Sequence, residues 1–434
     1  MAQEARDLAK EAARSLLAEW KWRTYIFGLA CLHRTGPMAR RLGRRALVVG
    51  NSHPWLDPTA EAVTASLQAT GMEVVGRVEG ARPNSPREDV FAIQDAIAAA
   101  RPKVVVAIGG GSTIDAAKAA GVLATFEGDL HDVGPYFGEG KVTRALEARG
   151  RRLPALLAVQ TAAGSGAHLT KYSNITDPAS AQKKLIIDTA IVPARAVFDY
   201  AVTRTAPPAL TADGAFDGIG HLAEPYYGAG PQSIDQLEAL ARAGVELIVS
   251  SLRQALESPD DLDAREALGL ATDLGGYAIM LGSTSGPHLN SFSMVDILAH
   301  GRACAVLQPY YTVLFAPAIK RQLRVLGEIY ARHGFIRAAL NPLGGRDLGL
   351  VVAEGMMGLS RTVGFPTTLG EVPGFTGEHV ARALAAAKNP QLASKLQAMP
   401  TPMSADQVDE FMGSVLEAAR TGELRHVRNL PQEE

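Results

Sequence analysis

The sequence predicts two parts in series: an α/β N-terminal domain with a Rossmann-like parallel sheet, followed by an all-α C-terminal domain. Short apolar runs at 46–51, 72–75 and 104–108 are separated by helical segments, as in a parallel sheet covered on both faces. After Pro207 and Pro208 the β-branched runs disappear and helical periodicity continues to the end. A glycine-rich turn directly after the third apolar run supports the α/β assignment.

The individual elements follow from the same patterns. The first twenty residues mix acidic and basic side chains at helical spacing, which predicts an amphipathic helix that packs on the body or serves an oligomer contact. They lack the apolar stretch of a secretory signal, and their acidic residues argue against a transit peptide. Further strands are expected at 155–159, 173–176 and 196–198. Helices are expected at 90–100, 236–255, 264–281, 303–315, 348–363, 378–387 and 405–419.

Composition excludes several classes of partner. The 434 residues include 43 basic and 45 acidic side chains, so a net charge of −2 gives no electrostatic case for nucleic acid or an anionic membrane. No apolar run approaches the roughly 18 residues that span a bilayer. Cys31 and Cys304 are too few for a disulfide framework, which fits a reducing cytoplasm.

Two glycine-rich loops indicate a nucleotide. Gly109, Gly110, Gly111 and Ser112 follow the buried run 104–108, so their N–H groups and the dipole of the next helix could hold a phosphate. The segment 160–166 repeats this small, hydroxyl-rich composition after another strand. Neither loop has the G-x-G-x-x-G spacing or a P-loop lysine, which disfavours ATP hydrolysis. A turn used only for packing is the alternative.

Four side chains in the second half suit one divalent metal ion. Asp217 and His221 are spaced i, i+4 on one helix face, and His288 and His300 stand beside a proline and a glycine. Three imidazoles and one carboxylate suit Fe²⁺ or Zn²⁺, without a choice between them. A surface ion pair is the alternative for the first pair.

The motifs together resemble the iron-containing (group III) alcohol dehydrogenase family over nearly the full length. The resemblance rests on Gly109-Gly-Gly-Ser-Thr-Ile-Asp115, Thr161-Ala-Ala-Gly-Ser-Gly166, Asp217-Gly-Ile-Gly-His221-Leu-Ala-Glu224, His300-Gly-Arg-Ala-Cys-Ala-Val-Leu-Gln-Pro309 and Gly364-Phe-Pro-Thr-Thr-Leu369. Tyr25-Ile-Phe-Gly28 resembles the opening hairpin of the family. The implied architecture is the one shared with dehydroquinate synthase. It divides the chain into a helical extension and hairpin at 1–40, a nucleotide-binding domain at 41–207 and a helical metal-binding domain at 208–434.

The resemblance also implies roles for individual residues. Asp217, His221, His288 and His300 would bind the metal and form the catalytic centre. The pyrophosphate and nicotinamide would be held by residues of the two loops and their neighbours: Asn51, Gly109, Gly110, Gly111, Ser112, Asp115, Thr161, Ala162, Ser165 and Lys183. Asp199 would be structural or on the cofactor side.

The sequence departs from the family pattern at several positions. Many members have a histidine where this chain has Phe292, and a glutamate where it has His168. Asn51 stands where an aspartate often repels a 2′-phosphate, so NADP is not excluded, with a slight preference for NAD. Cys304 is expected to be a small core residue rather than a ligand.

The predicted function is reversible, metal-dependent hydride transfer between a primary or secondary alcohol (aldehyde or ketone in reverse) and NAD or NADP, in a cleft between the two halves. Alternatives are a metal- and NAD-dependent lyase of the dehydroquinate synthase kind, a metal-free reductase and a non-catalytic nucleotide-binding protein. Lys171 or Arg302 could pair with an anionic substrate, although a solvated lysine is the simpler expectation. The expected partners are a small-molecule alcohol or aldehyde and further copies of the chain, as a homodimer or larger oligomer.

Overall fold

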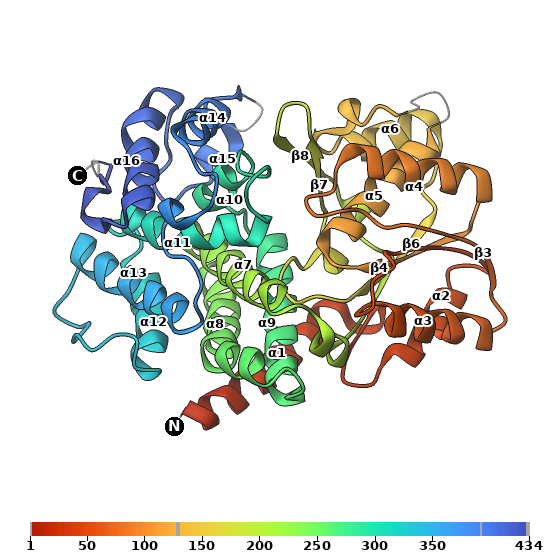
Figure 1. Ribbon diagram of the computed structural model, residues 1–434, viewed down its shortest axis with the longest axis horizontal. Helices are drawn as coiled ribbons and strands as arrows, with labels where there is room; N and C mark the ends of the chain where they lie inside the picture. The colour runs from red at the N-terminus through yellow and green to blue at the C-terminus, as the bar shows by residue number, and fades with distance from the viewer. Residues whose placement is uncertain (1, 127–130, 391–392, 431–434) are drawn as a thin grey trace. The chain divides into compact units, whose positions relative to one another are not determined.

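The computed structural model describes residues 2–126, 131–390 and 393–430, which fall into two compact units (Figure 1). The α/β unit contains residues 18–211 and 259–269. The helical unit contains the residues before 18, residues 212–258 and the residues from 270 onward. The fold class predicted from the sequence, a parallel-sheet domain followed by a helical one, is confirmed.

The α/β unit is built on a six-stranded sheet in the order β1-β9-β6-β4-β2-β3, in which every neighbouring pair is parallel. Its strands are β1 Tyr25–Gly28, β2 Arg45–Val49, β3 Glu73–Val78, β4 Val104–Gly109, β6 Ala155–Gln160 and β9 Arg195–Asp199. The unit's helices are α2 Thr35–Arg40, α3 Asp57–Ala69, α4 Arg87–Ala100, α5 Gly111–Thr125 and α6 Lys141–Arg149.

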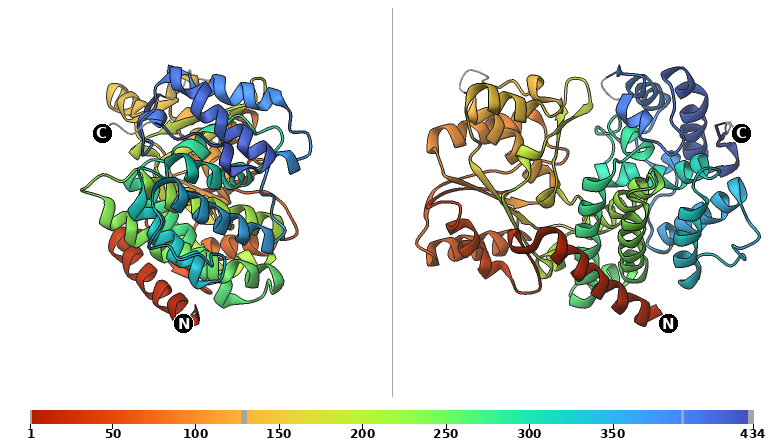
Figure 2. Two further views of the ribbon diagram at one scale, coloured as in Figure 1. Left: turned by 90° about the vertical axis from the view of Figure 1, so that its left-hand side faces the viewer. Right: turned by 180° about the vertical axis from the view of Figure 1, so that it is seen from behind.

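Helices cover both faces of this sheet, α2 and α3 on one and α4 and α5 on the other (Figures 1 and 2). Because successive side chains of a strand point to opposite faces, Leu47 and Val49 of β2 join the core beside α4 and α5. Ala46 and Val48 join the core beside α2 and α3. The continuous apolar runs in the sequence reflect this burial on both sides.

A second, three-stranded sheet has the order β5-β8-β7, with bounds Gly138–Glu139, Gln182–Ile187 and Tyr172–Asp177. β7 and β8 are antiparallel. The strand expected at 173–176 is therefore present but leaves the main sheet. The sequence pattern did not reveal β8, because Gln182, Lys183 and Lys184 begin it with polar side chains.

The opening segment differs from the expected hairpin. Tyr25–Gly28 pairs in parallel with Arg195–Asp199 and forms the edge of the main sheet. The turn after it is fixed by Asp199, whose carboxylate accepts hydrogen bonds from the backbone N–H groups of Ala30 (3.0 Å), Cys31 (2.7 Å) and Leu32 (3.1 Å). Asp199 is therefore structural, which is one of the two roles expected for it.

The helical unit contains the remaining helices, whose bounds are α1 Ala2–Lys21, α7 Pro208–Tyr227, α8 Ile234–Glu257, α9 Leu262–Leu281, α10 Gly286–Ser291, α11 His300–Phe315, α12 Lys320–Arg332, α13 Gly345–Thr362, α14 Gly377–Ala387, α15 Ala393–Gln397 and α16 Val408–Thr421. The last turn of α1, the first turn of α7 and the first turns of α9 belong instead to the α/β unit, where Gly269 allows the ring of Tyr200 to approach. Helix α12 was not predicted. Within the described residues, no helix combines the length and apolar character that crossing a bilayer requires.

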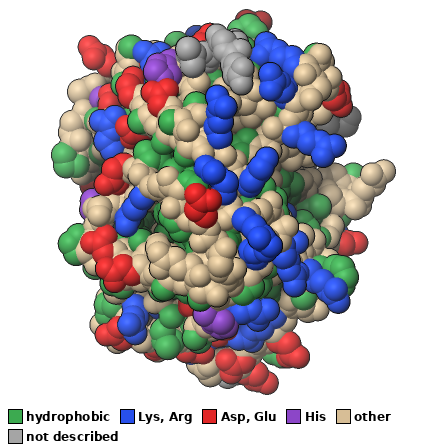
Figure 3. Space-filling model, turned by 90° about the vertical axis from the view of Figure 1, so that its right-hand side faces the viewer, with side chains coloured by type: hydrophobic (Ala, Val, Ile, Leu, Met, Phe, Trp, Pro, Cys, Tyr) green, Lys and Arg blue, Asp and Glu red, His purple; other side chains and the backbone are tan. Residues whose placement is uncertain are grey.

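The surface in Figure 3 mixes basic and acidic side chains with scattered hydrophobic ones, and neither sign of charge covers the face. This distribution agrees with the nearly balanced charge of the sequence.

We predict that Asp199→Ala lowers the free energy of unfolding by about 3 kcal/mol or more, because several N–H groups lose a charged acceptor. Urea unfolding measures this loss. The control is Asp409→Ala, which removes an exposed ion pair with Lys388 and should cost about 1 kcal/mol or less. Equal effects of the two changes would contradict the role assigned to Asp199.

Candidate metal centre and nucleotide cradle

Helix α7 presents three charged or polar side chains on one buried face. Asp217, His221 and Glu224 are spaced i, i+4 and i+7 and are 4%, 5% and 1% exposed. Burial of two carboxylates so close together requires compensating partners, since an unpaired charge in a protein interior costs several kcal/mol. This face of α7 is therefore built for a cation or a set of hydrogen bonds.

His300 comes close to this face because a glycine follows it. A Cβ atom added at Gly301 would lie 2.6 Å from the carbonyl oxygen of Asp213 and 2.9 Å from the Cβ of Asp217. Only glycine lets the first turn of α11 pack so closely on α7. Close packing of α11 on α7 thus explains why a glycine follows His300 in the sequence.

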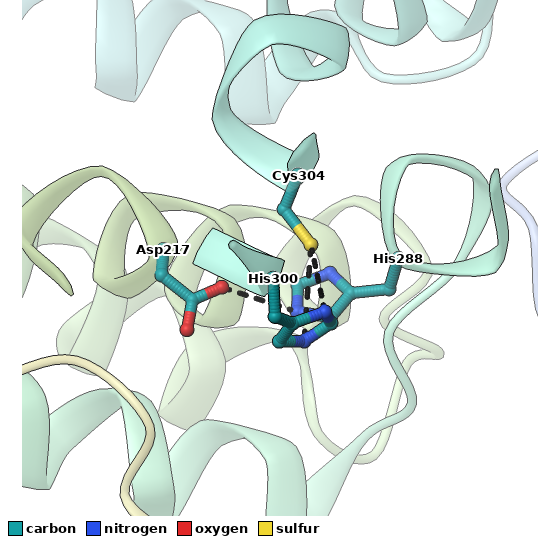
Figure 4. Close-up of side chains that lie close together, drawn as sticks. All are labelled: Asp217, His288, His300 and Cys304. Carbon is teal, nitrogen blue, oxygen red and sulfur yellow. Dashed lines mark hydrogen bonds and ion pairs between the residues drawn. The ribbon is translucent and has the colours of Figure 1, made fainter. Parts of the chain in front are cut away.

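The ligand atoms of Asp217, His288, His300 and Cys304 all lie within 4.8 Å of one another (Figure 4). His221 adjoins this cluster. Its Nδ1 is 3.9 Å from Asp217 Oδ2, and its ring centroid is 4.8 Å from that of His288. The structure therefore brings together all four predicted metal ligands, three of them in one mutual cluster with a cysteine.

Glu224 determines which nitrogen of His288 faces the cluster. Glu224 Oε1 lies 2.5 Å from His288 Nδ1, so this nitrogen donates a hydrogen and leaves the lone pair on Nε2. Glu224 Oε2 accepts a hydrogen bond from the backbone N–H of Ser285 at 2.7 Å. Burial by itself would lower the pKa of His288, but Cys304 and Glu224 raise this pKa well above its ordinary value, so a cation that binds Nε2 must displace a proton from it.

Ser291 orients His300 in a similar way. Its hydroxyl donates to the carbonyl oxygen of His288 at 2.7 Å, so its oxygen is left to accept a hydrogen from His300 Nδ1, 3.1 Å away. The lone pair of His300 is then on Nε2. Outer partners of this kind fix the tautomer of histidines that bind metals.

The residues present fit a divalent cation. Asp217 Oδ1 and His288 Nε2 are buried and have no hydrogen-bond partner in the described part of the chain, although they lie only 3.7 Å apart. Two unsatisfied acceptors at this distance would be unfavourable unless a cation, or a proton on the imidazole, lay between them. Carboxylate oxygen and imidazole nitrogen are ligands that Zn²⁺ and Fe²⁺ both accept.

Sequence reasoning did not assign a role to Glu224 and expected Cys304 to be a core residue. The spacing of Glu224 from Asp217, seven residues along the same helix, was the available signal for its place on this face. Cys304 is indeed buried, at 1% exposure, but its sulfur also lies among the ligand atoms. Its spacing of four residues from His300 places both side chains on one face of α11.

The two glycine-rich loops are neighbours in the α/β unit. β4 and β6 are adjacent and in register, with Gly109 opposite Gln160, so the loops leave the same edge of the sheet. A Cβ atom added at Gly111 would lie 2.8 Å from the side chain of Ser165 in the second loop. Helix α5 begins at Gly111, and its first N–H groups have no partner within the helix. These groups form a site suited to a phosphate.

Other predicted cofactor residues adjoin this cradle. The Ser112 hydroxyl accepts from the backbone N–H of Asn84 at 3.1 Å, and Asn84 Oδ1 accepts from Lys183 Nζ at 3.1 Å. Thr161 Oγ1 is buried and has no hydrogen-bond partner among the described residues. Ala162 faces Gly110, 3.6 Å from the position of an added Cβ. These residues can therefore contact one ligand lying along the loops.

Asp115 and Asn51 make mainly structural contacts. Asp115 Oδ2 accepts from the backbone and side-chain nitrogens of Asn174, both at 3.0 Å, and thereby joins α5 to β7. Asn51 Nδ2 donates to the carbonyl oxygen of Ala81 at 3.0 Å and fixes the turn after β2.

The two cations considered for an anionic substrate both have partners. Arg302 Nε donates to Asp213 Oδ1 at 2.7 Å, and its guanidinium lies 5.1 Å from the centroid of the Phe365 ring. Lys171 Nζ lies 5.8 Å from the ring centroid of Tyr172. Arg302 is thus engaged within its own unit.

Comparison with known proteins gives consistent matches for both units. Residues 23–200 match the family profile described as iron-containing alcohol dehydrogenase, and residues 211–414 match the profile of the C-terminal part of that family. The chain is 31% identical over 318 residues to alcohol dehydrogenase 4 of Saccharomyces cerevisiae, covering 71% of this chain and 78% of that protein. It is 27% identical over 288 residues to the NAD-dependent methanol dehydrogenase of Bacillus methanolicus, covering 66% and 72%. The crystal structure of a 1,3-propanediol oxidoreductase is similar, with a TM-score of 0.77 at 24% identity and coverage of 91% and 97%.

We predict that Glu224→Gln lowers the affinity for Zn²⁺ about 10- to 100-fold, because His288 loses the charged partner that orients it. Competition with a chromophoric chelator measures the affinity. The matched control is Glu246→Gln, which alters another buried carboxylate paired with a histidine, His333, at 2.7 Å. Metal affinity that falls equally in both variants would show a general loss of stability instead.

We predict that Gly110→Ala lowers nucleotide affinity about tenfold without changing the free energy of unfolding. The new methyl group meets protein only at the Cβ of Ala162, 3.6 Å away, and the backbone angle φ of −81° is ordinary for alanine. The methyl group would instead occupy the space where a pyrophosphate approaches the backbone. Calorimetric titration with NAD measures the affinity, and Gly121→Ala in the helix that follows Gly110 is the control. Unchanged affinity in Gly110→Ala would place the nucleotide elsewhere.

Proposed function

The chain belongs to the iron-containing alcohol dehydrogenase family and is an oxidoreductase, and we propose that it interconverts a small alcohol and its aldehyde or ketone with NAD and one divalent metal ion. The reaction converts the alcohol and NAD⁺ into the carbonyl compound, NADH and a proton. The lyase and the non-catalytic alternative are not favoured, since family membership points to alcohol oxidation. The observation that carries the proposal is the pair of buried atoms Asp217 Oδ1 and His288 Nε2, which lie 3.7 Å apart and have no hydrogen-bond partner among the described residues.

Each residue of the centre has a role in this proposal. Asp217, His221, His288 and His300 hold the cation, and Glu224 and Ser291 keep the Nε2 lone pairs of His288 and His300 directed at it. A bound divalent cation supplies Lewis acidity toward the alcohol or carbonyl oxygen. The burial of these side chains excludes water from around the reacting oxygen, which strengthens the electrostatic effect.

In the α/β unit the glycine-rich loop and the start of α5 hold the pyrophosphate, while Thr161, Ala162 and Ser165 line the adjoining region. NAD is proposed rather than NADP because a carboxylate lies beside Asn51. Glu79 Oε2 accepts from the backbone N–H of Ser52 at 3.2 Å, so negative charge stands where a 2′-phosphate would approach.

A cytoplasmic location and a homo-oligomeric assembly are also proposed. The two cysteines are buried in different units and are not joined in a disulfide, which suits a reducing cytoplasm. A homodimer or larger assembly is proposed from family resemblance. An uncharged small alcohol is the proposed substrate, because Arg302 is already paired with Asp213.

We predict that chelation of the metal abolishes alcohol-dependent NADH formation and that added Zn²⁺ or Fe²⁺ restores it. His288→Ala should lower turnover at least about 1,000-fold, on the order expected for loss of a metal's electrostatic contribution. NAD binding should survive all three treatments, since the nucleotide residues belong to the other unit. Absorbance at the NADH band and calorimetric titration are the two measurements. His333→Ala, which removes a histidine paired with Glu246, is the control. Full turnover of the metal-free His288→Ala protein would refute the mechanism.

A further inference from the structure

A cavity of about 370 Å³ lies within the α/β unit, between α5, α6 and the segments that lead into β6 and β9. Its lining includes Val105 and Ala155, which stand near the amino ends of β4 and β6. The same two strands end at Gly109 and Gln160, where the glycine-rich loops begin. The cavity and the proposed nucleotide cradle are therefore at opposite edges of the sheet.

The wall of this cavity is apolar. It is formed mainly by buried or half-buried aliphatic side chains, namely Val105, Ala117, Leu146, Leu153, Leu156 and Ile191. Lys118 also borders the cavity, but its ammonium group already donates to the carbonyl oxygens of Thr170 at 3.0 Å and Tyr172 at 2.6 Å. A ligand in the cavity would therefore meet hydrocarbon along most of its length.

Gly121, in the interior of α5, keeps part of this space open. Glycine destabilises a helix interior relative to alanine, so its presence there needs a reason. Close packing does not supply one, because an added Cβ would lie 3.7 Å from Pro154 Cγ, an ordinary van der Waals distance. Pro154 and Gly121 both border the cavity. Glycine at this position thus leaves room between α5 and the segment that enters β6.

The mouth of the cavity is positively charged. Arg151 and Arg152 border it and are exposed, and neither forms an ion pair with a residue that the structure describes. None of the described lining residues is acidic. Guanidinium groups bind carboxylates through paired, charge-assisted hydrogen bonds. Two such groups beside an apolar wall are complementary to a molecule with an anionic head and a hydrocarbon tail.

We propose that this cavity binds a medium-chain carboxylate, with its head group at Arg151 and Arg152 and its hydrocarbon chain directed toward Gly121. The volume falls within the range of about 300 to 1,000 Å³ that is usual for small-molecule sites. The site is separate from the residues of the proposed function, so neither the metal nor the nucleotide is needed for binding.

Calorimetric titration of the metal-loaded full-length protein with octanoate, in the presence of saturating NADH, tests the proposal. The wild type should bind octanoate, and the double variant Arg151→Gln, Arg152→Gln should bind it at least about tenfold more weakly, since charge-assisted hydrogen bonds are lost. Gly121→Leu should weaken binding by a similar factor, because its side chain fills the cavity. The matched control is Arg40→Gln, Arg41→Gln, an adjacent pair of arginines at the end of α2 that does not border the cavity.

Octanamide, which has the same chain without the charge, should bind the wild type at least about tenfold more weakly than octanoate. No binding of octanoate to the wild type would overturn the inference. Equal affinities in the wild type and in the Arg151→Gln, Arg152→Gln variant would also overturn it, because they would place octanoate at another site. The arginine variant decides the question if Gly121→Leu does not fold. Alcohol-dependent NADH formation by the wild type without octanoate tests the proposed function separately.

Discussion

Two buried carboxylates on α7 impose the constraint that the rest of the helical unit satisfies. Glu224 finds its partners in His288 Nδ1 and the backbone N–H of Ser285, so α10 must begin where it does. Asp217 retains an oxygen without a hydrogen-bond partner in the described chain, and it faces His288 Nε2. The Glu224 carboxylate orients the His288 imidazole, and the Asp217 carboxylate can bind a cation. Together they form the centre of the proposed metal site, to which α7, α10 and α11 contribute.

The packing that supports this site is close. Gly301 permits α11 to approach α7, and in Gly220 an added Cβ would lie 3.3 Å from His288 Cε1. The small residues interspersed with the ligands in the motifs are thus part of the same geometry. The residues proposed to bind the nucleotide belong to the other unit, where the parallel sheet brings the ends of β4 and β6 to one edge. The proposed metal ligands are therefore positioned by the packing of the helical unit, and the proposed nucleotide-binding loops are positioned by the sheet of the α/β unit.

The sequence predicted the fold and the site best where a local pattern is compatible with only one structure. Apolar runs buried on both faces identified β2, β4 and β6, and helical spacing identified the face of Asp217 and His221. Local sequence patterns did not predict contacts between residues that are distant in sequence. β1 pairs with a strand about 170 residues away, β8 starts with lysines, and the position of Cys304 depends on how α11 packs on α10. The roles of Glu224 and Ser291 likewise depend on tertiary contacts that no spacing rule describes.

The proposed function requires one cation among these side chains. Anomalous X-ray diffraction at the absorption edge of the bound metal, collected from metal-loaded crystals, locates such an ion without reference to activity. One strong peak is expected in the helical unit, within bonding distance of Asp217 Oδ1 and His288 Nε2 and adjacent to His300 and Cys304. A peak elsewhere, or none at these residues in protein that retains alcohol-dependent reduction of NAD, would contradict it.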